Sequence, residues 1–595
     1  MSSSRSGRDR GGALIATPLT RTGPGATTAG PDRIIWRARE ETAIVDVDVR
    51  SLLGGSARLA GRVGDEAYYI GLCIRAGLLR PEPPYRLARM LRAFERRGLL
   101  AAPVTISALR AGDDVAMRDE RGAVTYRELD ERTNALANAW RAHGLRAGEG
   151  VAILARNHRG FLYAVFAAAK CGAKIVLLNT SFAGPQIREV ATREGTDLLV
   201  FDDEYATMLA GIEPPHGHWR AWTDDPADAG LDTLEALIAR GSTAAPPKPQ
   251  QPPRIVILTS GTTGTPKGAP RSEPRSLSLV GGLLSKVPFR AREVTELCVP
   301  MFHALGFTHM VLGIALGSEL VVRRHFDPKV TLDSLHDHRV TALVVVPVML
   351  RRILDLGDEA VHRRDLQDLR IIFVGGSQFG ADLARRSLET FGPIVYNLYG
   401  STEVAYATIA TPQDLEQEPG CVGGVVHGTV VKILGDDDRE VPAGVTGRIF
   451  VANSSQFEGY TGGETKEQIG GLMSTGDVGH FDAAGRLFID GRDDEMIVSG
   501  GENVFPGEVE ELLAGHPAIA EVAAIGVPDE SFGQRLRAYV VLRDGEQLTE
   551  DDAKAYVREN LARYKVPREI VFLDELPRNP TGKVLKRHLD EGSSR

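Results

Sequence analysis

The feature that most constrains the fold is a regular alternation of short apolar runs with longer amphipathic stretches. Helical spacing over Thr125–Gly144 is followed by a strand-like run at Val151–Leu154, a helical stretch ending at Cys171, and another apolar run at Lys174–Leu178. Further runs of the same kind lie at Leu198–Phe201, Leu320–Arg323, Ala342–Pro347 and Leu369–Gly376. Strands that alternate with helices favour a parallel sheet covered on both faces, so the sequence predicts an α/β fold.

One further apolar run leads into a loop of hydroxyls and glycines. The run Ile255–Leu258 is typical of a strand, and the loop after it ends at Lys267. Glycines let the backbone approach a ligand, hydroxyl and amide groups donate to anionic oxygens, and the lysine adds charge. A Walker A loop is excluded because that motif has glycine directly before its lysine, where Pro266 stands. We therefore expect another kind of phosphate loop, formed by Thr259, Ser260, Gly261, Thr262, Thr263, Gly264 and Lys267.

Length, charge and cysteine usage narrow the class of protein. A chain of 595 residues is too long for one ordinary core, so we expect at least two domains. The net charge of -9 argues against nucleic acid as a partner. Four widely separated cysteines show no metal-ligand or disulfide spacing, which favours a cytoplasmic location. No apolar run reaches the roughly 18 residues of a membrane-spanning helix.

The N-terminal part of the chain differs from the middle. Residues 1–55 are rich in small and polar residues at their start and are predicted to be a disordered tail. Residues 56–110 are predicted to be an extension that carries a basic amphipathic helix at Tyr85–Arg97. Its apolar face would consist of Leu87, Met90, Leu91 and Phe94. Two interpretations remain open: peripheral contact with the inner, anionic membrane face, or packing on its own domain with solvated arginines.

Two adjacent glycines interrupt a predicted helix after the phosphate loop. Gly281 and Gly282 each cost about 1 kcal/mol relative to alanine in a helix interior, so the missing side chains have a structural reason. That reason is either close helix packing or a cavity for an extended apolar ligand, and the sequence leaves both open.

Several separated motifs complete the pattern. Gly375–Ser377 forms a Gly-Gly-Ser turn after a strand, and Tyr399–Glu403 has the sequence Tyr-Gly-Ser-Thr-Glu. Ser474–Asp477 and Gly491–Arg492 follow, and a Pro/Gly loop ends at Lys583. In this order the motifs resemble the adenylate-forming superfamily of acyl-CoA synthetases, nonribosomal adenylation domains and luciferases. Within it the chain is most similar in look to bacterial fatty-acyl-CoA synthetases, over about Val115 to Leu589.

The resemblance implies a nucleotide-binding role for each matched residue. Tyr399 would stack on adenine, Thr402 would contact the α-phosphate, and Glu403 would bind Mg²⁺, for which a carboxylate is a suitable ligand. Asp477 would accept the ribose hydroxyls, assisted by Arg492. The turn beside the adenine would include Gly376 and Ser377, and Gly400 would belong to the nucleotide-binding motif Tyr399–Glu403.

The resemblance also implies catalytic and moving parts. Lys583 would be the cation that stabilises the transition state, and His303 would lie near the carboxylate pocket. With them, Thr263 and Glu403 complete the predicted catalytic set. Asp494 would be the hinge of a mobile domain that brings a backbone edge to the pantetheine path. That edge would be formed by Gly500 and Gly501.

The expected architecture is a large N-terminal adenylate-forming domain of layered sheets and helices over residues 111–493, and a small mobile α+β C-terminal domain over residues 494–595. The expected function is an ATP-dependent acyl-CoA synthetase for a carboxylic acid, with a medium- or long-chain fatty acid favoured. The acid would first form acyl-AMP, with release of pyrophosphate, and then the CoA thioester, with release of AMP. The implied cofactors are ATP, Mg²⁺ and coenzyme A.

Two other functions remain open at this stage. The chain could be a fatty acyl-AMP ligase or an adenylation enzyme that loads a carrier protein. A function of another class is a non-catalytic nucleotide- or lipid-binding protein at a membrane. The sequence does not indicate an oligomeric state.

Overall fold

The computed structural model describes residues 33–37, 44–48, 64–224, 232–259, 267–271, 276–463, 465–493, 497–499, 502–529, 533–561, 565–579, 582–586 and 588–589. Residues 1–64 and 65–595 form two separate units. In the first unit, β1 (Arg33–Arg37) pairs antiparallel with β2 (Ile44–Asp48). Both strands fall inside the segment predicted to be a tail, most of which lies outside the described residues, so the tail remains a prediction.

The second unit contains a six-stranded sheet with the order β10-β9-β6-β5-β7-β8. The pairs are parallel, except that β10 runs antiparallel to β9 at one edge. All five residues of β5 are buried, as expected for a strand covered on both faces. The strands are β5 (Gly150–Leu154), β6 (Lys174–Leu177), β7 (Thr196–Asp202), β8 (His218–Trp222), β9 (Arg254–Thr259) and β10 (Lys267–Arg271).

A nine-stranded sheet forms the second layer, with the order β17-β16-β15-β14-β13-β11-β12-β3-β4. Its middle, from β15 to β3, is parallel, and antiparallel strands close both edges. The strands are β3 (Val115–Asp119), β4 (Gly122–Thr125), β11 (Val294–Leu297), β12 (Glu319–Val321), β13 (Ala342–Val345), β14 (Ile371–Gly375), β15 (Val395–Tyr399), β16 (Thr408–Ala410) and β17 (Gly424–Val425). The predicted α/β alternation is therefore confirmed.

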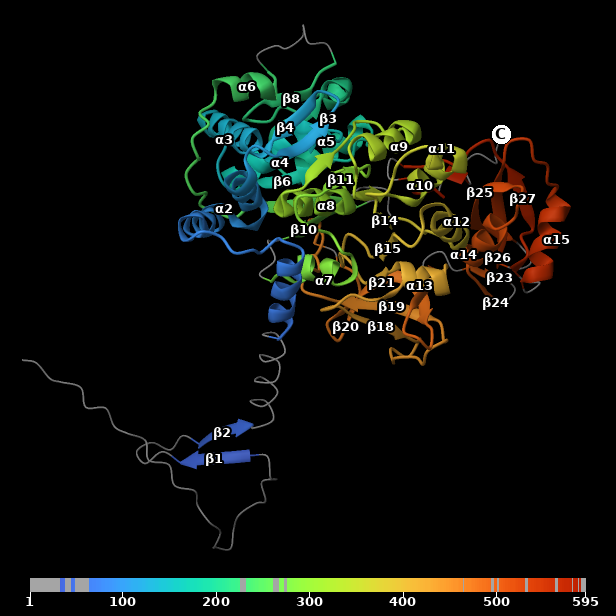
Figure 1. The fold of residues 1–595 in the computed structure, drawn as a ribbon. Helices are drawn as coiled ribbons and strands as arrows, with labels where there is room; N and C mark the ends of the chain where they lie inside the picture. The colour runs from blue at the N-terminus through green and yellow to red at the C-terminus, as the bar shows by residue number, and fades with distance from the viewer. Residues whose placement is uncertain are drawn as a thin grey trace, which may run out of the picture. The chain divides into compact units, whose positions relative to one another are not determined.

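Helices cover the two sheets and join them through one continuous core (Figure 1). α3 begins at a capping box between Thr125 and Glu128, and α4 ends at Gly172, whose positive φ of 72° suits a glycine. The helices are α2 (Pro84–Ala111), α3 (Tyr126–Ala142), α4 (Arg159–Cys171), α5 (Gly184–Arg193), η1 (Asp203–Leu209), α6 (Leu234–Arg240), α7 (Ser278–Lys286), α8 (Ala304–Leu316), α9 (Pro328–Asp337), α10 (Pro347–Leu354), α11 (Asp358–His362), α12 (Ala381–Phe391) and α13 (Pro412–Gln417).

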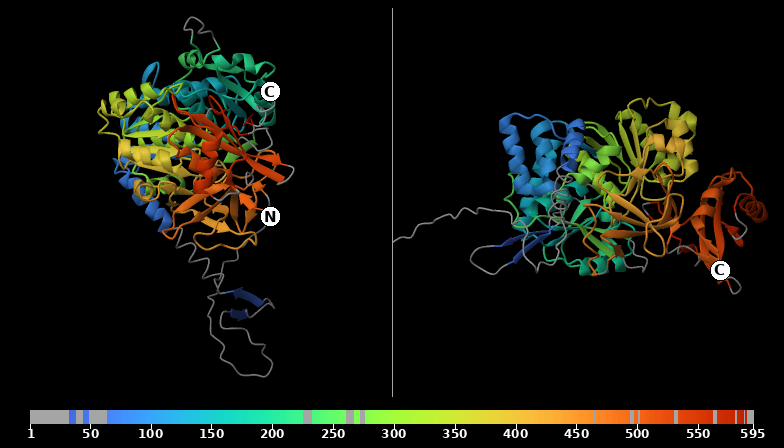
Figure 2. Two further views of the ribbon diagram at one scale, coloured as in Figure 1. Left: turned by 90° about the vertical axis from the view of Figure 1, so that its right-hand side faces the viewer. Right: turned by 90° about the horizontal axis from the view of Figure 1, so that it is seen from below.

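Two smaller sheets follow. The first is antiparallel and consists of β18 (Val430–Leu434), β19 (Gly447–Ala452), β20 (Gln468–Ile469), β21 (Leu472–Phe481) and β22 (Leu487–Arg492). The second belongs to a C-terminal α+β domain with its own apolar core. Figures 1 and 2 show this domain in red as a body distinct from the two large sheets. It consists of β23 (Ile497–Ser499), β24 (Glu502–Val504), α14 (Pro506–Ala514), β25 (Ile519–Asp529), β26 (Gly533–Leu542), α15 (Glu550–Asn560) and β27 (Glu569–Phe572).

The predicted amphipathic helix forms the first half of α2, which is kinked at Gly98 (φ 68°). Met90 is buried, whereas Leu87, Leu91 and Phe94 are exposed. The helix packs through Met90, Ala93 and Arg97, and the burial of Arg97 includes its guanidinium nitrogen Nη1. Within the described ranges, no helix is both long enough and apolar enough to cross a bilayer.

The two glycines of α7 are explained by close packing. A Cβ on Gly281 would lie 2.3 Å from Cδ1 of Tyr69, which belongs to a helix of residues 64–75. A Cβ on Gly282 would lie 2.4 Å from the hydroxyl of Tyr406, and that hydroxyl donates to the carbonyl of Ser278 at 2.6 Å. Aromatic rings therefore occupy the space that the alternative interpretation assigned to a ligand cavity.

Candidate active site

The candidate site lies where β14 and β15 end, beside β21 and β22. Gly376 follows β14 with a positive φ of 94°, a conformation that suits glycine, and Tyr399 is the last residue of β15. In parallel sheets the carboxyl ends of the strands are the usual place for a ligand. Two of the predicted motifs are thus brought to one edge by the sheet itself.

Asp477 is the centre of a hydrogen-bonded cluster at this edge. Its Oδ2 accepts from the Tyr399 hydroxyl at 2.6 Å, and its Oδ1 accepts from Nη1 of Arg492 at 3.2 Å. Asp477 and Arg492 are direct cross-strand partners in β21 and β22, which explains their ion pair. Burial raises the pKa of Asp477, and Arg492 and the Tyr399 hydroxyl partly offset this effect. The structure therefore brings together three residues that the sequence predicts for adenosine.

Two lysines add positive charge to the Asp477 cluster. Lys583 and Lys466 both act to lower the pKa of Asp477, which places their ammonium groups within electrostatic range. Nζ of Lys466 would lie 3.5 Å from a Cβ on Gly476, next to Asp477. Lys583 is exposed, in a tight loop where its amide donates to Oδ1 of Asn579 at 2.9 Å. A group of cations beside a buried carboxylate suits a ligand that carries phosphates.

Glu403 lies in a sharply folded loop after β15. A Cβ on Gly400 would lie 2.3 Å from the carbonyl oxygen of Ala405, whose φ is 64°, so position 400 requires glycine. Arg271 donates to the carbonyl of Thr402, and burial lowers the pKa of Arg271 to about 10 although Glu403 opposes the shift. The loop is thereby fixed to β10, which directly follows the predicted phosphate loop.

Residues 457–461 join the two phosphate-binding motifs. The Tyr460 hydroxyl donates to Oε1 of Glu403 at 2.7 Å, and Nζ of Lys267 lies 5.4 Å from the centre of the Tyr460 ring. The backbone adds bonds from Phe457 to the Glu403 carbonyl at 2.8 Å and from Thr461 to the Gly268 carbonyl at 2.9 Å. We call residues 457–461 the strap. Nothing in the sequence marked it, because its role depends on contacts with residues about 50 and 190 positions away.

His303 is the N-cap residue of α8, and its ring packs against Phe302 at a tilt of 43°, with ring centres 4.6 Å apart. Burial lowers the pKa of His303 to about 4, so its imidazole is neutral near pH 7. Its buried Nε2 makes no hydrogen bond within the part of the chain that the structure describes. A neutral imidazole with one unsatisfied nitrogen fits a site for a polar ligand atom.

Some predicted site residues lie outside the described residues. These are Ser260, Gly261, Thr262, Thr263, Gly264, Asp494, Gly500 and Gly501, and for Thr259 only the backbone is described. Their roles remain predictions. Conversely, the structure adds residues that the sequence did not single out, namely Arg271, Tyr460 and Lys466.

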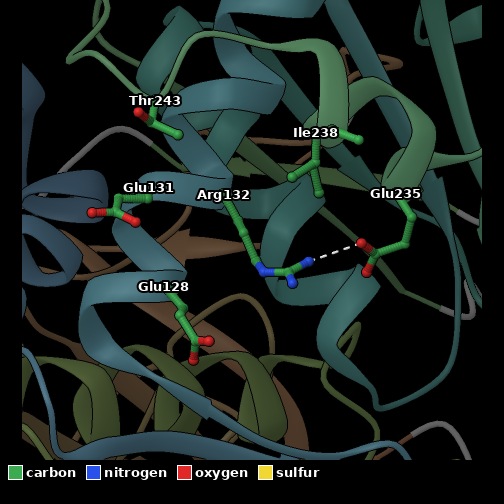
Figure 3. Close-up of a pocket in the computed structure, with 7 residues that line it drawn as sticks. Glu128, Glu131, Arg132, Glu235, Ile238 and Thr243 are labelled. Carbon is green, nitrogen blue, oxygen red and sulfur yellow. Dashed lines mark hydrogen bonds and ion pairs between the residues drawn. The ribbon is translucent and has the colours of Figure 1, made fainter.

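A surface hollow of about 320 Å³ lies elsewhere, between α3 and α6 (Figure 3). Arg132 points across it to Glu235 and pairs with it at 2.8 Å. α6 contacts β8, at the edge of the six-stranded sheet opposite β9 and β10. The hollow shares no residue with the candidate site.

The donors and acceptors of the site fit a magnesium nucleotide. Glu403 is 8% exposed, and both its carboxylate and the ammonium group of Lys267 contact Tyr460 of the strap. Mg²⁺ is commonly bound by one or two carboxylates together with phosphate oxygens, so the Glu403 carboxylate is a suitable ligand. Asp477 has further lone pairs for ribose hydroxyls, since each of its oxygens has one protein donor in the bonds described above.

Comparison with known families identifies the chain. The model of the AMP-binding enzyme family matches residues 104–461, and that of the AMP-binding enzyme C-terminal domain matches residues 508–583. The chain belongs to the AMP-binding enzyme family. It is an acid–thiol ligase of the AMP-forming, adenylate-forming class. Ligases of this class use ATP and Mg²⁺, with coenzyme A as the acceptor in the CoA ligases.

AMP-binding enzymes with different substrates are similar to this chain. Indoleacetate–CoA ligase of Aromatoleum aromaticum is 33% identical, over 79% of this chain and 93% of its own. Long-chain-fatty-acid–CoA ligase FadD13 of Mycobacterium tuberculosis is 30% identical over 79% and 93%, and the fatty acid–[acyl-carrier-protein] ligase ScoC of Streptomyces coeruleorubidus is 29% identical over 79% and 92%. The structure of ATP-bound MatB from Rhodopseudomonas palustris has a TM-score of 0.73 at 26% identity, over 84% of this chain and 98% of that one.

Proposed function

We propose that this AMP-binding enzyme is a fatty-acid–CoA ligase that activates a medium- or long-chain carboxylate as acyl-AMP and transfers the acyl group to coenzyme A. The single observation that carries the proposal is the cluster of Tyr399, Asp477 and Arg492 with the Lys583 loop beside it. That cluster offers an acceptor for ribose, an aromatic ring for a base, and cations for phosphates.

In the first half-reaction the carboxylate of the acid attacks the α-phosphate of ATP, and pyrophosphate leaves. Lys583, Lys466 and Lys267 supply positive charge where negative charge gathers on the phosphoryl oxygens. Mg²⁺ would be held by Glu403, which Tyr460 orients at 2.7 Å, and would neutralise phosphate charge. His303 presents a neutral nitrogen, which can donate to or accept from the acid without forming an ion pair.

In the second half-reaction the CoA thiol attacks the activated carbonyl, and AMP leaves. We propose that the C-terminal domain rotates about Asp494, which withdraws Lys583 and brings Gly500 and Gly501 to the thiol's path. One cleft would then serve two reactions in sequence.

The proposed acid class is supported by two of the relatives, FadD13 and ScoC, whose names refer to fatty acids. Indoleacetate–CoA ligase is slightly more similar to the chain, and so an aryl acid is the competing substrate class. The proposed acceptor is coenzyme A. The similarity to ScoC supports a carrier-protein phosphopantetheine as the second candidate acceptor.

We also propose that the enzyme makes peripheral contact with the inner face of an anionic membrane. The exposed apolar side chains Tyr85, Leu87, Leu91 and Phe94 lie on the first half of α2. The same half carries the exposed guanidinium groups of Arg89, Arg92 and Arg96. Apolar and basic side chains on one exposed segment are complementary to acyl chains and acidic headgroups.

Pyrophosphate release across a panel of fatty and aryl acids, with mass spectrometry of the products, tests the reaction. We expect acyl-CoA from fatty acids of medium or long chain and at least tenfold less product from indoleacetate. Acyl transfer to a holo carrier protein but not to CoA would favour the second acceptor. An enzyme that accepts aryl acids alone would contradict the fatty-acid assignment.

Sedimentation with vesicles tests the membrane contact. We expect binding to vesicles that contain phosphatidylglycerol, weaker binding in high salt, and loss of binding in the Leu91→Ser variant. Val445→Ser, at an exposed valine outside α2, is the matched control. Equal binding by both variants would exclude α2 as the contact surface.

A further inference from the structure

The loop that carries Lys583 is placed by contact with the N-terminal domain. Inside the loop, the Arg578 guanidinium donates to the carbonyl of Gly582 at 2.5 Å. Gly582 has a φ of 77°, and a Cβ there would lie 2.2 Å from Cγ1 of Val348, at the start of α10. Because only a glycine allows this approach, the position of Lys583 depends on how the C-terminal domain sits on α10.

A hydrogen bond joins α10 to the C-terminal domain close to this loop. Nη1 of Arg351, in α10, donates to the carbonyl of Ala520, in β25. Burial lowers the pKa of Arg351, while Glu521 of the C-terminal domain acts to raise it. A half-buried guanidinium needs acceptors, and here the C-terminal domain supplies one of them.

A second contact lies at the start of α12. The N-cap residue Gly380 provides no side-chain acceptor for the first amides of this helix. Glu511, in α14 of the C-terminal domain, lies beside this end of the helix: burial raises the pKa of Glu511, the Ala381 amide acts against that shift, and Oε1 would lie 3.3 Å from a Cβ on Gly420. A carboxylate is favourable at the N-terminus of a helix, so Glu511 caps α12 from the other domain. Ser377 belongs to the turn that is predicted to border adenine, and α12 begins four residues after it.

Both contacts belong to the same domain as Lys583, in which α14 packs on β25 and β26. β25 and β26 pack against the segment that carries Lys583 through a shared core of Ala523, Tyr539, Leu576 and Leu589. A rotation that withdraws Lys583 therefore moves Ala520 and Glu511 as well, and it breaks the contacts with α10 and α12.

We propose that Arg351 and Glu511 are positioning residues that hold the C-terminal domain in the orientation in which Lys583 faces the Asp477 cluster. They then serve formation of the acyl adenylate and not formation of the thioester. This inference rests on the proposed function, because it assigns the two contacts to one of its two half-reactions.

The test measures the two half-reactions separately in the full-length enzyme. The variants are Arg351→Ala and Glu511→Ala, and the control is Arg352→Ala, at the exposed neighbour of Arg351 on the same helix. We expect ATP–pyrophosphate exchange to fall about tenfold or more in both variants, as for loss of a charge-assisted hydrogen bond. Thioester formation from supplied acyl adenylate and CoA should stay within twofold of wild type. Equal losses in both half-reactions, or no loss in exchange, would overturn the proposal.

A combination with Lys583→Ala distinguishes positioning from a general effect on folding. If Arg351 acts through Lys583, the double variant Arg351→Ala/Lys583→Ala should exchange pyrophosphate no more slowly than Lys583→Ala alone. Multiplied losses would overturn the proposal, because independent effects add in free energy. A wild-type enzyme that exchanges with no acid, yet forms thioester from supplied adenylate, would overturn the proposed function together with this inference.

Discussion

At the scale of single residues, burial determines the charge of the groups around the site. Burial raises the pKa of Asp477, and Arg492, Lys583 and Lys466 act against this shift. Burial lowers the pKa of His303 to about 4, so this histidine acts near pH 7 as a neutral polar group rather than as a cation. The same residue types at exposed positions would carry their ordinary charges.

Asp477→Asn should weaken use of ATP and leave the fold intact. The asparagine amide carries no charge and cannot form an ion pair with Arg492. One of the two carboxylate oxygens is replaced by an NH₂ group, which donates where Tyr399 or Arg492 needs an acceptor. We expect kcat/KM for ATP to fall by about 10- to 100-fold, which corresponds to about 1.5–3 kcal/mol for hydrogen bonds to a charged group. Asp437→Asn, at an exposed turn, is the control. An unchanged KM and kcat for ATP would contradict the role assigned to Asp477.

Glu296 gives a pH-dependent prediction for stability. It is 1% exposed, accepts from Ser334 at 2.6 Å, and burial raises its pKa from 4.5 to about 7. The native state therefore keeps a proton that the unfolded state has lost between these pH values, and stability falls as the pH rises through that window. Glu296→Gln keeps an acceptor for Ser334 and carries no charge. The free energy of unfolding of this variant, relative to that of wild type, should increase from pH 4.5 to pH 7 and stay constant at higher pH. Urea denaturation of both proteins at several pH values measures this difference. A difference in free energy of unfolding that does not change with pH would contradict the prediction.

At the scale of elements, aromatic rings connect the N-terminal extension to the site. The helix of residues 64–75 packs Tyr69 on Gly281, and the other side of α7 packs on Tyr406, three residues after Glu403. The strap then joins the Glu403 loop to β10. The extension is thus connected, through α7, to the element that carries the predicted magnesium ligand.

Gly281→Ala should destabilise the protein by about 1–3 kcal/mol, as expected for overpacking against the ring of Tyr69. Tyr69→Ala makes room for the new methyl group, so the double variant should be more stable than the two single losses predict. Urea denaturation of the four proteins measures this coupling. Gly71→Ala, with open space around the glycine, serves as the control and should cost nothing. Additive losses would show that position 281 does not contact Tyr69.

At the scale of the whole molecule, the C-terminal domain has its own core, yet its Lys583 lies close enough to act on the pKa of Asp477. A domain with few hydrogen bonds to its neighbour can change orientation at small cost. Two chemically different steps can therefore share one cleft if the domain presents a different edge in each.

Lys583→Ala should separate these steps. We expect ATP–pyrophosphate exchange to fall by at least 100-fold, because the cation proposed to stabilise the phosphates is lost, and thioester formation from supplied acyl adenylate to remain. Lys554→Ala removes a lysine that pairs with Glu550 on the outside of the same domain, and it is the control. Equal loss in both half-reactions would refute the division of labour.

Much of the candidate site could be predicted because its residues lie in short contiguous motifs. Tyr399 and Glu403 share one loop after a strand, and Asp477 and Arg492 each close a recognisable motif. The strap, Lys466, Arg351 and Glu511 could not be predicted, because each acts on a partner from another part of the chain. The sequence left open whether the apolar face of α2 packs on its own domain, since helical spacing does not say which side a domain covers; in the structure Met90 of that face is buried and Leu87, Leu91 and Phe94 are exposed.

The sequence by itself determined the α/β alternation, the order of the motifs and the family, because strand periodicity and loop chemistry are local properties. Only the tertiary structure decided which side chains meet: Asp477 with Tyr399 and Arg492, Glu403 with Tyr460, and Tyr69 with Gly281. The physical reason is that hydrogen bonds and packing act over a few ångströms. Residues hundreds of positions apart come within that range only when sheets and domains are in place.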